Sequence, residues 1–506
     1  MSATRGRAAW IVLGLLTATQ VGIGAWRAGV MFRGGLAAGL RPLGWSSGLG
    51  VDVLLCGLLG VIAWWWLPAR GRGPRDAASW GVRFLLLAWL LTLAHYSWGM
   101  AAGRLSPLLT WIVLAALFGA GISIRRMGGA EAAPPLPPAP PPGAHFALGI
   151  AAAFLAAQLP HLVFNYSFMD AKATWACRAF KLAEHGALTG ILDCLDPARP
   201  PLHAVMLWLG VGDPTFEGRL LPLLMFGAFV LVFHRLLQRI APRLAVWGVV
   251  WLLATDHVFK GQVSTYTGVP EMLAIAIALA VAIDERALAP TRSFALLIAI
   301  VASAATALTR RDGFPEFVVA AGVLIIVTRR WRDPLPWALI AAASVAYLSW
   351  VFRPAVLQGI PAFPLSASAG VLVQATTEAP AGTGWLWTLL QGAQGQVFSH
   401  YGYGAFVWSW LIVTIWARRG GAPAAGMPPA TLYGILGLTG WLATLAAYAA
   451  LTLLGHPYMS TLFVVRTGFG RHLVHFFPLC LLHATAVAER LVSGEGARLV
   501  SGERGG

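Results

Sequence analysis

Apolar segments long enough to cross a lipid bilayer recur along the whole chain, and they constrain its fold more than any other feature. Apolar runs of roughly 17 to 25 residues span a bilayer as helices. About fourteen candidate segments can be placed in the sequence, at 8–26, 50–67, 82–99, 105–124, 145–164, 219–233, 244–259, 268–283, 293–309, 314–328, 335–352, 398–417, 432–454 and 472–489. The sequence therefore predicts an all-α polytopic membrane protein.

The composition agrees with that prediction. Hydrophobic residues make up 58% of the 506 residues and charged residues only 11%, and the mean hydropathy is +0.70. These values lie far from those of an average soluble domain. The formal net charge of +16 would indicate a nucleic-acid partner in a soluble chain, but here we expect none, because the arginines cluster between the apolar segments.

The arginine clusters predict an orientation in the membrane. They are Arg70, Arg72 and Arg75; Arg125 and Arg126; Arg235, Arg239 and Arg243; Arg329, Arg330 and Arg332; and Arg418 and Arg419. If the N-terminal end is cytoplasmic, strict alternation of the segments puts every cluster in the cytoplasm, where positive loops are retained. Both termini are then cytoplasmic. The polar loops at 165–217, 260–267, 310–313, 353–396 and 455–471 lie outside.

The same pattern predicts how the chain is divided. Residues 1–131 would form an accessory module of about four spans, 132–143 a proline-rich cytoplasmic linker, 144–491 a domain of about ten spans, and 492–506 a cytoplasmic tail. We interpret 8–26 as a retained first span and not as a cleaved signal. Residues 200–212 are too short to cross, which favours a short interfacial or half-inserted helix in the external loop. The loop at 353–396 is either a cover over a site or a connector.

The cysteines leave one question open. Cys177 and Cys194 share the external loop, where oxidation is permitted, so the two are either bridged or free. Cys56 and Cys480 lie in apolar segments and are expected to be buried.

The candidate functional residues lie at the external ends of the segments. The chain has no glycine-rich phosphate loop after a strand, no cysteines at zinc spacing and no His-Glu-x-x-His motif. The external charged residues mix acids and bases, as a site that moves a proton and holds an anion requires. Asp193, Asp196 and Asp256 are interpreted as solvated surface.

Several external motifs occur in a fixed order. Tyr-Ser-Phe-Met-Asp at 166–170 precedes Arg-Pro-Pro-Leu-His at 199–203, and Gly-Gln at 261–262 precedes Glu-Met at 271–272. Leu-Thr-Arg-Arg-Asp-Gly at 308–313 and Arg-His at 471–472 follow. In this order the chain, from about residue 145 to 491, resembles the GT-C class of membrane glycosyltransferases. The nearest members are the dolichyl-phosphate-mannose protein mannosyltransferases, the aminoarabinose transferases and the bacterial Rgt-like proteins.

The resemblance implies a GT-C-like helix bundle and roles for individual residues. Asp170 would orient or deprotonate the attacking hydroxyl group, and Glu271 would be a second acid that binds sugar, acceptor or metal. The implied substrate-binding residues are Lys172, Arg199, His203, Gln262, Arg310, Arg311, Arg471 and His472. Many relatives carry two adjacent acids in the first loop, whereas Ala171 follows Asp170 here, which leaves metal binding and the identity of the base open.

Each of these residues also has a structural interpretation. Asp170 could cap a helix, and Arg199 could extend to lipid headgroups. Arg310 and Arg311 could bind headgroups without catalysis, and Glu271 could pair with a neighbouring arginine. The histidines could be hydrogen-bond partners at the interface.

The resulting expectation is a transferase of the bacterial inner or plasma membrane, with its active site on the periplasmic side. It would move a sugar from a polyprenyl-phosphate donor to a glycan, lipid or protein acceptor, with inversion at the anomeric carbon and with membrane lipids around it. No soluble cofactor is required, and a divalent metal ion is left open. The alternative is a transporter or flippase for a lipid-linked or anionic substrate, for which charges midway through the spans would be expected.

Overall fold

The computed structural model describes helices in every apolar region of the chain. It describes residues 2–37, 47–67, 76–126, 143–158, 175–194, 200–210, 220–263, 268–310, 313–352, 390–391, 393–395, 397, 403–418, 428–453 and 470–493. These residues form helices and turns, and none of them lies in a strand. The prediction of an all-α polytopic membrane protein is confirmed at this level.

Nine of the described helices are long and apolar enough to cross a membrane. They are α1 (Ser2–Ala37), α2 (Ser47–Trp65), α3 (Ala77–Ala102), α4 (Pro107–Arg126), α10 (Leu220–Ile240), α15 (Arg292–Thr309), α17 (Pro334–Val351), α21 (Pro429–Leu453) and α24 (Phe477–Ser493), the last preceded by the short helix η5 (Val474–Phe476). A multi-pass helical membrane protein follows from these segments.

The remaining predicted segments contain shorter helices. α5 (Ala144–Ala156), α13 (Gly268–Ile283), α16 (Gly313–Thr328) and α20 (Phe406–Arg418) are apolar but 13 to 16 residues long. The segment at 244–259 is divided into α11 (Ala245–Leu253) and α12 (Asp256–Val263). The number of fourteen crossings therefore stays a prediction.

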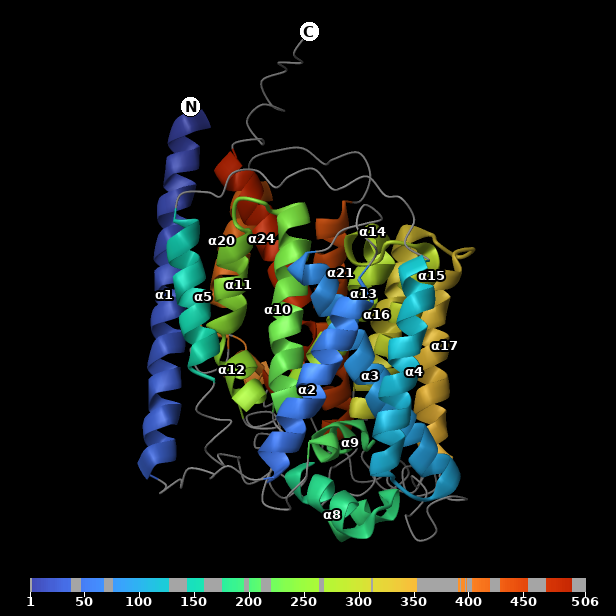
Figure 1. Cartoon of the computed structure of the whole chain (residues 1–506). Coiled ribbons are helices and arrows are strands. Elements are labelled where there is room, and N and C mark those ends of the chain that lie inside the picture. The colour runs from blue at the N-terminus through green and yellow to red at the C-terminus, as the bar shows by residue number, and fades with distance from the viewer. Residues whose placement is uncertain are drawn as a thin grey trace.

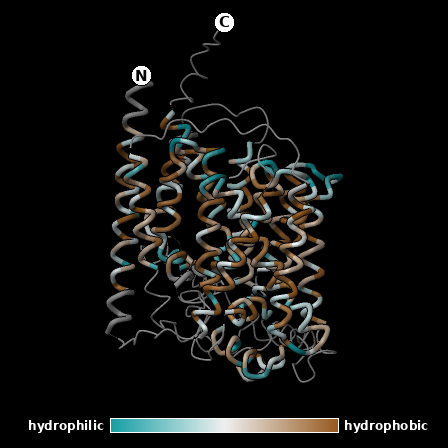
Figure 2. Tube along the Cα trace, in the orientation of Figure 1, coloured by the Kyte–Doolittle hydropathy of each residue, from teal (hydrophilic) through white to brown (hydrophobic). Residues whose placement is uncertain are grey.

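The long helices run side by side, and the two ends of the bundle differ (Figure 1). α10 finishes and α15 and α17 begin at the end that also carries the short helix α14 (Glu285–Leu288), and we call this the arginine end. The short helices α8 (Cys177–His185) and α9 (Leu202–Leu209) lie at the opposite end (Figure 1). Figure 2 shows hydrophobic residues along the helices and hydrophilic residues mainly towards their ends.

Burial separates interior helices from peripheral ones. Two thirds of the apolar window of α3 is buried (67%), but only 22% of that of α1. α3 packs closely on α10 and α15, and Gly81 makes this approach possible because a Cβ there would lie 2.7 Å from the Ala228 carbonyl oxygen. α1 packs on α24 and α11. Helices from residues 1–131 thus contact the rest of the bundle directly, and the predicted module boundary stays a prediction.

Ion pairs tie the helices together at the arginine end. Arg292 contacts both Glu285 and Asp333, so it joins α14 and α15 to the start of α17. Arg330 Nε donates to Asp333 over 2.6 Å. Arg239 Nε lies 2.9 Å from Asp284. Two of the arginines that predict the orientation, Arg239 and Arg330, are therefore neutralised by nearby acids.

The helices at the opposite end are fixed covalently and by apolar packing. A disulfide joins Cys177 at the start of α8 to Cys194, which follows the helix η2 (Leu188–Asp193). The bridge that the sequence left open is thus formed, and Cys56 and Cys480 are buried as expected. α9 is the short helix predicted within residues 200–212, and all eight of its side chains are buried inside the protein. Its interfacial or half-inserted placement stays a prediction. A helix that is apolar all round needs burial on every face.

Candidate functional site

Six polar side chains meet inside the bundle, towards the end opposite the arginine end; five come from five helices and the sixth follows the end of another helix. They are Glu271, Arg310, Glu316, Thr444, His472 and His475, and we call them the Glu271–His475 cluster. Glu271 lies in the first turn of α13 and Glu316 in the first turn of α16. Arg310 follows the last residue of α15. The two histidines lie in α23 (Gly470–Leu473) and η5, and Thr444 lies in α21.

Local contacts hold the short helices α23 and η5 against α21. Trp441 Nε1 donates to the Leu473 carbonyl oxygen over 2.9 Å. Gly440 allows Phe476 to lie directly against α21, because a Cβ at Gly440 would be 2.1 Å from the phenyl ring. The imidazole of His475 is therefore presented to α13 and α16 from a fixed backbone.

A glycine makes room for the Glu271 carboxylate. A Cβ at Gly313 would lie 1.3 Å from Glu271 Oε1, so the carboxylate can keep this position only while residue 313 has no side chain. Gly313 is the first residue of α16. The carboxylate thus lies at a helix N-terminus, where the helix dipole stabilises negative charge.

His475 lies between two carboxylates. Its Nε2 is 3.0 Å from Glu271 Oε2, and its Nδ1 is 3.2 Å from Glu316 Oε2. All three side chains are buried. Two carboxylates this close favour the charged form of the imidazole, although only Nδ1 is aligned for a hydrogen bond, with Glu316. Thr444 completes the inner edge by donating to Glu316 Oε1 over 3.0 Å.

Arg310 and His472 form the outer edge of the cluster. Arg310 Nε lies 3.7 Å from Glu271 Oε2, and Arg310 Nη2 lies 2.8 Å from His472 Nε2. A guanidinium has only donors, so His472 Nε2 accepts this bond and His472 is neutral. Both residues are partly exposed, whereas Glu271 is completely buried.

The cluster is close to electrically balanced. Two carboxylates face one guanidinium and one imidazolium, which compensates buried charge that would otherwise be very costly. His472 also stacks on His475, with ring centroids 5.6 Å apart, and meets Tyr448 edge-on at 5.4 Å. Chemically, the arrangement offers a positioned cation at its partly exposed edge and, behind it, an imidazole in close contact with two carboxylates.

The structure brings together three of the residues that the sequence predicted, namely Glu271, Arg310 and His472. The pairing of Glu271 with an arginine is the structural interpretation that the sequence had left open. Asp170, Lys172, Arg199 and Arg311 lie outside the described residues, as do most of the loop at 353–396 and most of the linker and tail. Gln262 and Arg471 lie in α12 and α23, where the structure describes the backbone only.

Two other predicted positions differ from their interpretation. The prediction that Asp256 is solvated is wrong. The residue is only 3% exposed, and its Oδ1 lies 3.3 Å from Arg27 Nε of α1. Asp256 begins α12, and the ion pair ties this helix to α1 inside the bundle. His203 is also buried, in α9, with the ring of Trp175 edge-on at 5.7 Å. Packing against an indole suits a structural role for His203 as much as substrate binding.

The sequence analysis missed Glu316 and His475. His475 follows His472 by three residues, which places both on one helical face, and Glu316 follows the Gly313 turn by three. Both lie within apolar segments and were assigned to the membrane. The signal that could have found them is the presence of ionisable residues within a span.

Among the described residues, no group of three or more histidine, cysteine, aspartate or glutamate side chains could hold a metal ion. Comparisons of the chain with protein families, curated proteins and solved structures found no match. The function must therefore be argued from the chemistry of the site.

Proposed function

We propose that the protein is a membrane glycosyltransferase that moves a sugar from a polyprenyl-phosphate donor to an acceptor at the outer face of the membrane. The observation that carries the proposal is the Glu271–His475 cluster, in which Arg310 at a partly exposed edge is held by Glu271 and His472. The order of the external motifs, which resembles that of the GT-C class, agrees with it. The acceptor is a glycan, a lipid or a protein.

The chemistry requires a positioned cation. When the sugar leaves its donor, the bond between the anomeric carbon and the phosphate oxygen breaks, and negative charge develops on the phosphate. A guanidinium held in place beforehand stabilises this charge without reorganisation. Its planar fork also matches phosphate oxygens. Glu271 is buried behind Arg310, so we assign Glu271, His475 and Glu316 to positioning and electrostatic balance.

An acid must also act on the acceptor. Asp170 of the first external loop is our candidate for orienting or deprotonating the attacking hydroxyl group. The hydroxyl oxygen then forms the new bond to the anomeric carbon from the opposite face, with inversion. Lys172, Arg199, Arg311 and Arg471 are candidate phosphate-binding residues.

The orientation and the number of crossings belong to the same proposal. We propose about fourteen crossings with the arginine end in the cytoplasm of a bacterial cell and the cluster near the periplasmic side of the inner membrane. The Cys177–Cys194 disulfide supports this orientation, because disulfides persist in oxidising compartments.

A transporter or flippase is the second candidate, and one observation favours it. Glu271, His475 and Glu316 form a buried acid and histidine chain within helices, an arrangement that occurs in proton relays of transporters. The one-sided position of the cluster favours the transferase.

A donor-turnover assay separates the two candidates. Wild-type protein in lipid nanodiscs is offered a panel of polyprenyl-phosphate sugars, and release of polyprenyl phosphate is followed by mass spectrometry. Asp170→Asn is tested beside Asp196→Asn, a matched change in the same loop. Release of polyprenyl phosphate by wild type and by Asp196→Asn, but not by Asp170→Asn, supports the transferase. Movement of an intact labelled donor between the leaflets of liposomes, without release, would support the flippase instead.

A further inference from the structure

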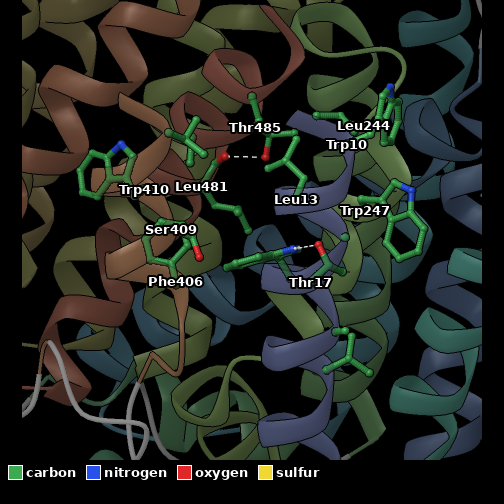
Figure 3. A pocket seen from close by; sticks show the side chains of 18 of the residues that line it. Trp10, Leu13, Thr17, Leu244, Trp247, Phe406, Ser409, Trp410, Leu481 and Thr485 are labelled. Carbon is green, nitrogen blue, oxygen red and sulfur yellow. Dashed lines mark hydrogen bonds between the residues drawn. The ribbon is translucent and has the colours of Figure 1, made fainter. Parts of the chain in front are cut away.

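A cavity of about 450 Å³ lies between α1, α5, α11, α20 and α24, away from the Glu271–His475 cluster. None of the cluster residues lines it. Its walls are mainly aliphatic and aromatic, and four tryptophans contribute to them: Trp10, Trp247, Trp251 and Trp410 (Figure 3). An apolar cavity of this size within the bilayer calls for an apolar occupant.

The few polar groups in the wall are engaged within the protein. Thr17 accepts a hydrogen bond from Trp251 Nε1 over 2.9 Å (Figure 3). Thr485 and Ser409 each donate to a backbone carbonyl four residues earlier, over 2.8 and 2.7 Å. Since these three hydroxyl groups serve the protein itself, the wall is suited to hydrocarbon rather than to a polar ligand.

The α1 side of the cavity offers open space. Gly14 and Gly22 of α1 both line the cavity, and a Cβ at either position would meet no atom within 4 Å. α1 is also the second least buried of the nine candidate spans, with 22% of its apolar window buried. The cavity thus lies beside a peripheral helix, close to the surrounding membrane lipid.

Basic side chains lie next to the cavity at the arginine end. Leu244 and Ala488 line the cavity there. Arg243, beside Leu244, is 54% exposed and its Nε lies 3.9 Å from Glu489. Arg490 is an exposed residue of the last turn of α24, at the same end of the bundle, but it does not share a helix face with Ala488. Basic residues at this depth attract anionic lipid headgroups.

We propose that the cavity binds one acyl chain of an anionic glycerophospholipid, whose phosphate lies near Arg243 and Arg490. The apolar wall selects the chain, and the basic residues at its arginine end select the headgroup. This inference does not depend on the proposed transferase activity, because the cavity and the cluster share no residue.

Native mass spectrometry of the full chain tests the proposal. The protein is released from nanodiscs that hold equal amounts of phosphatidylglycerol and phosphatidylcholine, and retained lipid is counted. We expect one phosphatidylglycerol per wild-type chain. Gly14→Phe fills the cavity and should reduce its occupancy at least tenfold, whereas Gly57→Phe, at an exposed glycine of α2 that also has no neighbour within 4 Å, should retain it.

Two further variants make the result independent of a single substitution. Gly22→Phe fills the same cavity from another turn of α1 and should also lose the lipid. Arg243→Gln combined with Arg490→Gln should keep a bound lipid but abolish the preference for phosphatidylglycerol. Equal retention by the filled variants and Gly57→Phe, or equal retention of the two lipids by wild type, would overturn the proposal, as would displacement of the lipid by added polyprenyl phosphate.

Discussion

At the scale of single residues, the close approach of Gly313 and Glu271 decides the geometry of the cluster. A methyl group at residue 313 would occupy the position of Glu271 Oε1, 1.3 Å away. The carboxylate would have to move, and Arg310 and His475 would lose the partner that positions them. The site thus depends on a residue that contributes no functional group.

We therefore expect Gly313→Ala to lower donor turnover by about 10²-fold, a typical effect of losing a preorganised electrostatic contact. Gly322→Ala is the matched control, since Gly322 lies in the same helix with no atom within 4 Å of its Cβ position. Turnover of polyprenyl-phosphate sugar and the apparent Tm are measured for both. Equal turnover in the two variants would show that the position of the Glu271 carboxylate does not affect the reaction.

Asp333 is the residue whose charge should make stability depend on pH. Partial burial disfavours the ionised form, but the Leu335 amide, Arg330 and Arg292 outweigh it and hold the pKa of this carboxyl below its ordinary value. Asp333 also caps α17, with its side chain accepting from the Leu335 amide over 3.0 Å. A lowered folded-state pKa means that the stabilisation is present above the unfolded value of about 3.9 and is lost as the pH falls through the folded value.

Asp333→Ala should thus cost about 1–2 kcal/mol at neutral pH, the range for losing a helix cap. The difference from wild type should shrink below pH 4. Apparent Tm values at pH 7 and pH 3.5 check this, with Glu184→Ala, which removes an exposed carboxylate of α8, as a control. A penalty that is unchanged at pH 3.5 would show that the charge of Asp333 does not contribute.

At the scale of elements, small residues on α21 set its distance from α24. Gly434, Gly437 and Gly440 face His483, Cys480 and Phe476, and a Cβ at any of them would lie within 2.6 Å of its neighbour. Close packing through small residues is typical of helix pairs in membranes. The same contact carries Thr444 and His475 into the cluster.

Gly437→Leu should force α21 and α24 apart, because the Cys480 backbone nitrogen would lie 2.9 Å from the new Cβ and cannot yield. We expect a cost of roughly 1–3 kcal/mol, as for other overpacked cores, seen as a lower apparent Tm in detergent. Gly119→Leu on α4, which has no neighbour within 4 Å, should leave the Tm unchanged. An equal loss in both variants would refute a specific role for this helix contact.

The elements also show what the sequence could and could not predict. Hydropathy located the helices because each apolar run must satisfy its backbone within one helix. Hydropathy did not predict that 244–259 divides at Ala254, or that α9 is buried. Glu271, Arg310 and His472 were predicted from their positions at helix ends. Glu316 and His475 were missed because their partners come from segments more than 40 residues away in the chain, and only packing brings these together.

At the scale of the whole molecule, the arrangement of the helices predicts which loops face which compartment. Trp331 lies at the arginine end and is 55% exposed, and Glu184 lies on α8 at the opposite end. Glu184→Cys should react with a membrane-impermeant maleimide in intact spheroplasts, whereas Trp331→Cys should react only after lysis. The native thiols Cys56 and Cys480 are buried and should not react with the maleimide. Labelling of Trp331→Cys in intact spheroplasts would show that the protein has the opposite orientation.

Whether the Glu271–His475 cluster supports sugar transfer is tested by the rate of polyprenyl-phosphate release by Arg310→Gln. Arg286→Gln, at an exposed arginine of α14, is the matched loss of charge at the other end of the bundle. We expect a drop of at least 10²-fold for Arg310→Gln, partial rescue by Arg310→Lys, and a rate close to wild type for Arg286→Gln. Wild-type turnover by a folded Arg310→Gln protein would contradict this role of the cluster.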